Sequence, residues 1–144
     1  MARIGDVMTL RVVAVAPHET VHVAIARMLE ENVGSVAVCD VDELVGIFTE
    51  RDVLRLTGQE GGIGEPRVGD VMTRNVVTVT PDDDVVDAAA IMGERRIRHL
   101  PVVQDGKLCG VVGIRDVLRI LVELLWREHD AHARDQAREL LRRS

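Results

Sequence analysis

Short runs of aliphatic residues mark the extended segments of this chain. Runs of this kind predict β-strands, or a shorter extended segment where Pro17 ends the run: residues 12–15, 35–39, 44–48, 100–103 and 108–112. Asp105 and Gly106 separate the last two runs, and an Asp-Gly pair between strands is a strong signal for a tight turn. These two strands are therefore expected to form a hairpin.

Other apolar residues recur every three or four positions, which is the spacing of a helix with one buried face. The clearest example consists of Val21, Ala24, Ile25, Met28 and Leu29. Thr20 stands at its start, where a hydroxyl can cap free backbone N–H groups. The acidic run 82–84 precedes the matching helix of the second half, and we interpret it as a cap rather than a metal site. Further helices are expected from near Arg51 and near Arg115.

The sequence repeats after 64 residues, the distance from Gly5 to Gly69. Gly-Asp-Val-Met-Thr at 5–9 returns at 69–73, and Arg-Asp-Val-Leu-Arg at 51–55 returns at 115–119. Each copy shows the order strand, helix, strand, strand, helix, which predicts an α/β (α+β) fold. Because a copy of about 50 residues cannot bury its apolar side alone, two small sheets are expected to pack together about a pseudo-twofold axis.

This pattern divides the chain into four parts. The first repeat covers residues 4–57 and the second covers 68–121, with a Gly-rich linker at 58–67. Residues 122–144 have no counterpart in the first half, and their sparse apolar positions among charges predict a long amphipathic helix. Such a helix end is marginal in water. We expect it to pair with the same helix of a second chain, in a twofold homodimer with Trp126 at or near the interface.

The composition excludes several classes of function. Phe48 and Trp126 are the only aromatic residues and the formal net charge is -6, which argues against a nucleic-acid partner. No apolar run approaches the ~20 residues of a membrane span, and no secretory signal is visible, so a cytoplasmic protein without membrane contact is expected. Cys39 and Cys109 lie in apolar runs and are interpreted as buried thiols.

Catalytic and metal-binding patterns do not stand out in the sequence. There is no nucleophile–base pair and no phosphate-binding glycine loop between a strand and a helix, so we expect no enzyme and no required cofactor. His129 and His132 lie three residues apart on the last predicted helix, without an obvious third ligand. We interpret them as solvated, and no metal site is predicted.

A recurring motif at the end of each second hairpin strand carries the candidate chemistry. It reads Gly-Ile-Phe-Thr-Glu-Arg-Asp at 46–52 and Gly-Val-Val-Gly-Ile-Arg-Asp at 110–116. Thr49 at a helix start offers a hydroxyl beside free N–H groups, which suits phosphate, and Asp52 one turn later can accept both hydroxyls of a ribose. The other interpretation is that Thr49 and Asp52 only cap the helix. Arg51 and Arg115 could reach a phosphate or form ion pairs.

The repeat, the order of elements and these paired motifs resemble the CBS domain, named for cystathionine β-synthase, over roughly residues 4–120. The resemblance implies adenosine-ligand sites that cross the pseudo-twofold axis. One site would use Thr49, Asp52, Val76 and Val77, with Arg98 and His99 near the phosphate. The other would use Asp116, Val12, Val13, Gly34 and Ser35, again beside His99. The alternative for His99 is a structural histidine at a strand start.

The two implied sites differ in one position of the motif. Gly113 stands where the pattern has Thr or Ser, and the lost hydrogen bond to a charged group is worth roughly 1.5–3 kcal/mol, so the second site should bind phosphorylated ligands more weakly. The resemblance therefore implies a non-catalytic sensor of AMP, ADP, ATP or S-adenosylmethionine that signals to an unidentified protein. The alternative is an assembly dimer whose clefts bind no nucleotide.

Overall fold

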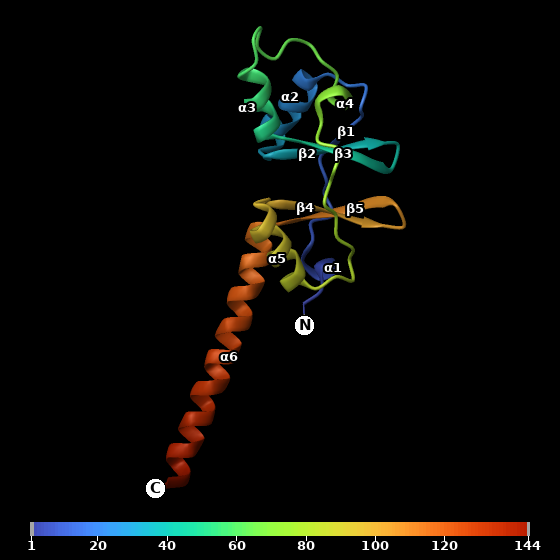
Figure 1. Ribbon diagram of the computed structural model, residues 1–144. Helices are drawn as coiled ribbons and strands as arrows, with labels where there is room; N and C mark the ends of the chain where they lie inside the picture. Colours follow the sequence, from blue (N-terminus) through green and yellow to red (C-terminus); the bar gives the residue numbers. More distant parts are fainter. Residues whose placement is uncertain (1, 144) are drawn as a thin grey trace.

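A computed structural model describes residues 2–143. The first repeat contains α1 (Ile4–Val7), β1 (Ala14–Val15), α2 (Val21–Glu31), β2 (Ser35–Asp40), β3 (Glu43–Thr49) and α3 (Glu50–Thr57). The second contains α4 (Val68–Val71), α5 (Val85–Arg95), β4 (His99–Gln104), β5 (Lys107–Gly113) and α6 (Ile114–Arg143). The predicted order of elements is confirmed, with an isolated β-bridge at Val79 in place of the first strand of the second repeat. Each repeat also opens with a short helix that the sequence did not predict (Figure 1).

Two small sheets face each other across the pseudo-twofold axis (Figure 1). In the first repeat β1 is parallel to β2, and β2 is antiparallel to β3. In the second, β4 is antiparallel to β5, and a parallel bridge between Val79 and Val102 takes the place of the short first strand. The pair Glu43–Lys107 joins the two hairpins, giving the strand order β1-β2-β3-β5-β4.

The predicted helix caps are confirmed. The Thr20 side chain accepts a hydrogen bond from the Val23 N–H at the start of α2. At the start of α5, the Asp84 carboxylate accepts one from the Val86 N–H at 2.8 Å. Each cap satisfies a backbone donor that the helix itself cannot pair, so the acidic run before α5 has a structural explanation.

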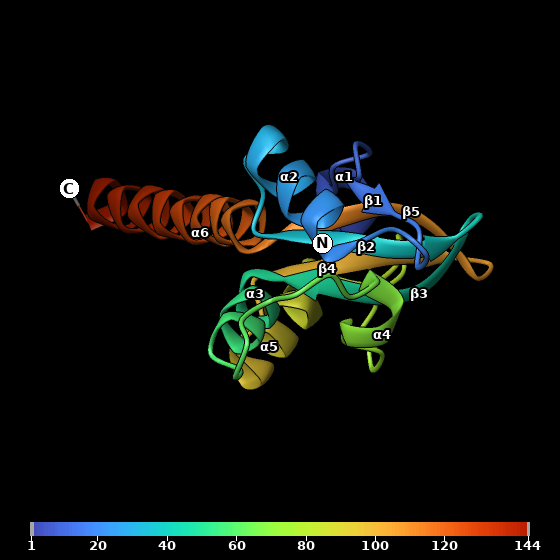
Figure 2. The ribbon, with the colours of Figure 1, turned by 90° about the horizontal axis from the view of Figure 1, so that it is seen from above.

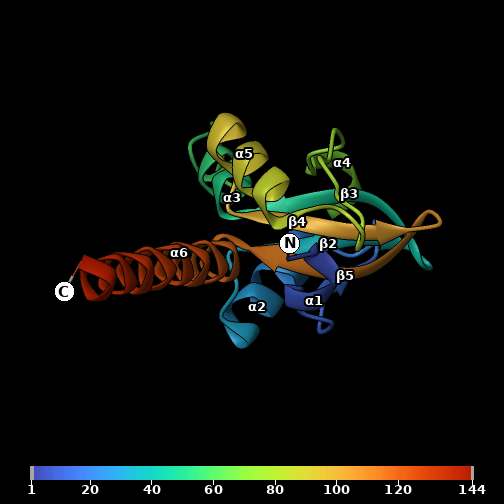
Figure 3. The same ribbon diagram turned by 90° about the horizontal axis from the view of Figure 1, so that it is seen from below.

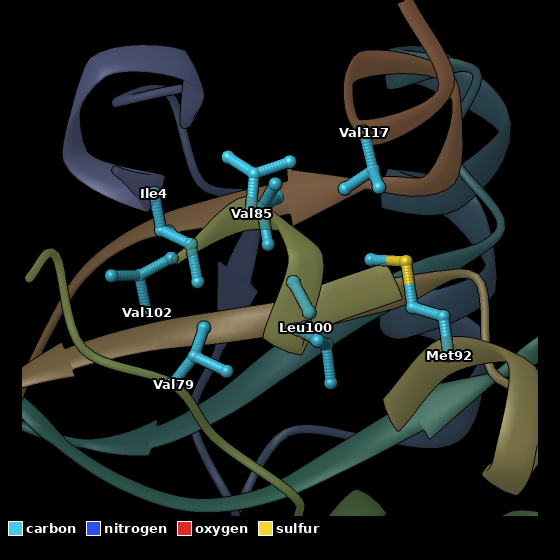
Figure 4. Close-up of a cluster of buried hydrophobic side chains, with 9 residues drawn as sticks. Ile4, Val79, Val85, Met92, Leu100, Val102 and Val117 are labelled. Carbon is cyan, nitrogen blue, oxygen red and sulfur yellow. The ribbon is translucent and has the colours of Figure 1, made fainter. Parts of the chain in front are cut away.

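The opening segment of each repeat packs on the other repeat. Residues 4–9 lie against the second repeat, where Ile4 is fully buried among Val79, Val85, Leu100 and other residues (Figure 4). Residues 68–73 lie reciprocally against the first repeat, where Val68 is fully buried. Backbone hydrogen bonds also join each opening segment to the other repeat. The Ile4 N–H donates to the Asp83 C=O, and the Val68 N–H donates to the Glu19 C=O, both at 2.8 Å. Each core is therefore built from one repeat together with the opening segment of the other repeat.

The last helix is continuous from the motif of the second repeat to the end of the described chain. Val117 is buried in the second core, and Ile114, Ile120 and Leu121 pack against it. Beyond these residues α6 leaves the body on the side away from the hairpin tips (Figures 2 and 3). The predicted extension at 122–144 is thus the outer part of α6, and its final residue, Ser144, lies outside the described residues.

Candidate functional site

Thr49 and Asp52 form a capping box at the start of α3. The Thr49 hydroxyl accepts a hydrogen bond from the Asp52 N–H at 3.3 Å, and the Asp52 carboxylate accepts one from the Thr49 N–H at 3.0 Å. The Thr49 hydroxyl also donates to the same carboxylate at 3.2 Å. A Thr-x-x-Asp sequence at a helix start favours this reciprocal arrangement. The capping interpretation of the two residues therefore describes their local geometry.

The Asp52 carboxylate has two further partners within the chain. Arg55 Nη2 donates to Oδ1 at 3.1 Å, and the Thr73 hydroxyl lies 3.3 Å from Oδ1 and 3.4 Å from Oδ2. The residue is only 5% exposed. A buried carboxylate requires such partners, since an unpaired one would lose its hydration without replacement. Its acceptor positions are accordingly occupied by the chain's own donors, one of which belongs to the opposite repeat.

A cavity of about 70 Å³ lies between the two repeats on the other side of the axis. It brings together four of the residues that the resemblance implied for the second site, Val12, Val13, Ser35 and His99. We call this space the inter-repeat cleft. The remaining lining residues are Arg11, Val33, Ala37, Ile47, Pro101, Leu108, Gly110 and Val111. Because both repeats line the cleft, a change in their relative position changes its shape.

Asp116 lies beside His99 at one end of the second-repeat hairpin. His99 and Gly113 are directly paired across β4 and β5. A Cβ placed on Gly113 would lie 3.6 Å from His99 Cδ2 and 3.8 Å from Asp116 Oδ2, so all three residues are neighbours. The Asp116 side chain is 31% exposed and pairs with Arg119 at 3.5 Å. Unlike Asp52, it keeps acceptor capacity that faces solvent.

His99 lies between charges of both signs. Partial burial of its ring lowers the pKa of His99, and Arg98 acts in the same direction, while Glu50 and Asp116 oppose them. More than a third of the residue is still exposed, so solvent screens these effects. The net direction favours the neutral imidazole, which can donate from one nitrogen and accept at the other.

Gly34 and Arg98 occupy equivalent positions and fix the starts of the two helices. The Gly34 C=O accepts from the Glu50 N–H at 3.0 Å, and the Arg98 C=O accepts from the Ile114 N–H at 2.8 Å. A Cβ on Gly34 would lie only 3.0 Å from Glu50 Oε1, so the glycine leaves room for that carboxylate. Val76 and Val77, predicted for the first site, are half-buried, and Val77 packs against the second core.

The sequence reasoning missed two kinds of residue. Thr73 was noted only as part of the repeated opening segment, although its hydroxyl binds Asp52. Gly46 and Gly110 open the motif because the opposite opening segment crosses them, with the C=O groups of Thr73 and Thr9 each 3.0 Å from the Cβ position. The repetition of Gly-Asp-Val-Met-Thr was the available signal, but nothing in it indicates the crossing.

Within residues 2–143, no group of three metal-ligating side chains occurs. Cys39 is buried, Cys109 is half-buried, and both are free thiols. No helix in this range is long and apolar enough to cross a membrane.

Comparisons with known proteins agree with the repeat. The family model described as "CBS domain" matches residues 4–58 and 68–123. The CBS domain-containing protein YhcV of Bacillus subtilis is 33% identical over 117 residues, which cover 81% of this chain and 84% of that protein.

Two solved structures show the same architecture. The CBS-domain containing protein ATU1752 from Agrobacterium tumefaciens is 31% identical with a TM-score of 0.75, covering 83% of this chain and 98% of that one. The structure of CBSX2 in complex with AMP is 32% identical with a TM-score of 0.77, covering 86% and 98%. With both repeats matched by the family model, the chain belongs to the CBS domain family and carries a tandem pair of these domains.

Proposed function

We propose that this protein is a non-catalytic regulatory module that binds an adenosine-containing ligand between its repeats and transmits the change to a partner protein. The observation that carries the proposal is the inter-repeat cleft, whose lining comes from both repeats. The AMP complex of CBSX2, a structure of the same fold at 32% identity, supports an adenine nucleotide as the ligand class. AMP, ADP, ATP and S-adenosylmethionine are the candidates.

We place the ligand on the Asp116 side of the molecule. The sequence favoured the Thr49–Asp52 side because only that copy keeps the motif threonine. Two features support the other choice: Asp52 is saturated by Thr49, Arg55 and Thr73, whereas Asp116 is partly exposed. A ribose approaching Asp52 would have to displace one of three residues that hold it, whereas the only side-chain partner recorded for Asp116 among the described residues is the exposed Arg119 at 3.5 Å.

The cleft and the residues beside it have separate chemical roles in this proposal. The valines at 12 and 13 and Pro101 line the cleft and supply apolar cover for an adenine ring. Asp116 lies outside the lining, next to His99, and accepts hydrogen bonds from two ribose hydroxyls. His99 and Arg98 lie at the same end as Asp116 and supply donors for a phosphate. Gly113 contributes no hydroxyl there, so the site is less dependent on a phosphate than one with threonine.

Ligand entry and signalling are linked through the size of the cleft. Its volume of about 70 Å³ is well below the roughly 300 Å³ at the lower end of small-molecule sites. Binding therefore requires the lining from the two repeats to move apart, and the ligand favours the orientation in which they have done so. A partner that contacts both repeats would sense this change, and a homodimer through α6 would carry it to a second copy.

The test is isothermal titration with AMP, ADP, ATP and S-adenosylmethionine on the native protein and two matched variants. We expect Asp116→Asn to bind roughly tenfold more weakly or worse, since a hydrogen bond to a charged group is worth about 1.5–3 kcal/mol. Asp52→Asn should bind like the native protein. The reverse order would move the site to the Thr49 side. Binding by none of the three proteins would favour the assembly alternative, in which the clefts are empty.

A further inference from the structure

The outer part of α6 extends away from both repeats (Figures 1 and 2). Every residue from Leu125 to Arg143 is exposed. This segment alone is about 28 Å long at 1.5 Å per residue. A helix of this length without tertiary packing is marginal in water, so its stability depends on a surface that covers it.

Between Val122 and Leu140, one side of this helix carries apolar side chains and no Asp, Glu, Lys or Arg. At about 100° per residue, six apolar side chains fall within an arc of roughly 120°, which also contains His129 and Gln136. We call them the outer stripe: Val122, Leu125, Trp126, Ala133, Ala137 and Leu140. Between Val122 and Leu140 every charged side chain lies outside this arc. The stripe is separate from the side of α6 that packs on the second core through Val117 and Leu121, and its large members are exposed, Trp126 by 63%.

The sizes of the stripe residues vary along the helix. Val122, Leu125 and Trp126 are bulky and lie near the body, Ala133 and Ala137 are small and lie toward the C-terminus, and Leu140 at the far end is bulky again. Leu125 and Ala133 are each four residues from His129. An antiparallel partner centred on His129 would therefore set Leu125 against Ala133, a bulky residue against a small one, on both sides of the axis, and Leu140 against Leu118 at each end. A parallel partner would set Trp126 against Trp126 and alanine against alanine.

The charges beside the stripe are unevenly distributed along the helix. Residues 122–132 carry three carboxylates against one guanidinium, and residues 133–143 carry four guanidiniums against two carboxylates. In an antiparallel pair the acidic half of each helix faces the basic half of the other. Glu123 and Arg134 lie on the same edge of the stripe and nearly equidistant from His129, so each would face the other residue's copy across the pair. The opposed helix dipoles favour the same orientation.

We propose that α6 binds the α6 of a second copy of this chain in antiparallel orientation, about a twofold axis close to His129. The interface is the outer stripe, flanked by two Glu123–Arg134 ion pairs. It is built without any residue of the inter-repeat cleft.

Site-directed disulfide formation tests the orientation on the full chain, without nucleotide and with Cys39 and Cys109 replaced by alanine. His129→Cys should cross-link with itself, because it lies at the axis. Leu118→Cys and Leu140→Cys should cross-link when the two proteins are mixed, one of them carrying a size tag, and neither should cross-link alone. Efficient self-linking of Leu118→Cys would show parallel pairing, and an absence of cross-links at all three positions would show no helix pair; either result overturns the proposal.

Sedimentation equilibrium provides the second test. The native chain should have twice its monomer mass of 15.9 kDa, and Trp126→Asp should be monomeric. Ala131→Asp places the same charge on the opposite face of α6 and should stay dimeric. Glu123→Arg and Arg134→Glu should each weaken the dimer, by roughly fivefold for two exposed pairs, and the double variant should recover. A monomeric native chain, or a double variant weaker than both singles, would contradict the pairing. Nucleotide titration of Trp126→Asp separates this result from ligand binding, which should persist.

Discussion

Replacing Gly46 by alanine adds a methyl group where the opening segment of the second repeat crosses β3. The new Cβ would overlap Met72 Sδ, and it would lie 2.9 Å from Met72 Cγ and 3.0 Å from the Thr73 C=O. The methionine side chain can turn away, but the carbonyl cannot, because Ile47 and Thr73 are held together by two backbone hydrogen bonds of 2.9 Å. Overpacking of this kind costs about 1–3 kcal/mol. We expect a loss near 2 kcal/mol, partly offset by the lower entropy of the unfolded chain.

Urea unfolding at 25 °C followed by circular dichroism measures the effect. Gly93→Ala is the matched control, since Gly93 lies inside α5 and a Cβ there would meet nothing within 4 Å. It should stabilise the protein by roughly 0.5–1 kcal/mol through helix propensity. The same substitution thus has opposite signs at the two glycines. A Gly46→Ala variant as stable as the native protein would refute the claim that the crossing requires glycine.

Three further outcomes follow from the structure. Val41 has a φ of 58° and is 91% exposed. Asparagine adopts positive φ more readily than a β-branched residue, so Val41→Asn should raise the free energy of unfolding by about 1 kcal/mol in urea titrations. An unchanged free energy of unfolding would argue against strain at this hairpin tip. Partial burial lowers the pKa of His99 from its ordinary value of 6.5, so the unfolded chain takes up the proton more readily than the native protein. The native protein should therefore lose stability relative to His99→Gln as the pH falls below about 6.5. Thermal melts at pH 7.5 and 5.5 measure the difference in melting temperature between the two proteins, and this difference would not change with pH if the ring were as hydrated as in the unfolded chain. Burial, assisted by Asp42, raises the pKa of the Cys39 thiol. A thiol reagent at pH 8, followed by mass spectrometry, should therefore label the half-buried Cys109 before Cys39. Equal labelling rates for the two cysteines would contradict the packing of β2.

Local patterns in the sequence predicted the elements well. Thr20 and Asp84 cap the helices they precede, and the hairpin at Asp105 forms as expected, because each depends on residues only a few positions apart. The long last helix was also predicted from spacing alone. Val12, Val13, Ser35 and His99 could be assigned to one site from the sequence because the family resemblance supplied a three-dimensional arrangement. All four line the cleft.

The environment of the two motif carboxylates could not be predicted in the same way. Asp52 and Asp116 stand in equivalent sequence positions, yet Asp52 is surrounded by donors and Asp116 is partly exposed. The difference comes from the threonine at 49 and from Thr73, which reaches Asp52 across 21 residues. A contact between two repeats leaves no periodic signal in either of them. Geometry was therefore needed to compare the two candidate sites.

The exchange of opening segments has a consequence for how the chain folds as it is synthesised. Ile4 is made early, yet it is buried against residues as distant as Val117 in one core. The first core is likewise incomplete until Val68 has been made. Contacts between such distant residues slow folding, because a large loop must close before the contacts can form. Neither half can finish alone, so the chain should fold late and as one cooperative unit, with a single unfolding transition despite its two repeats.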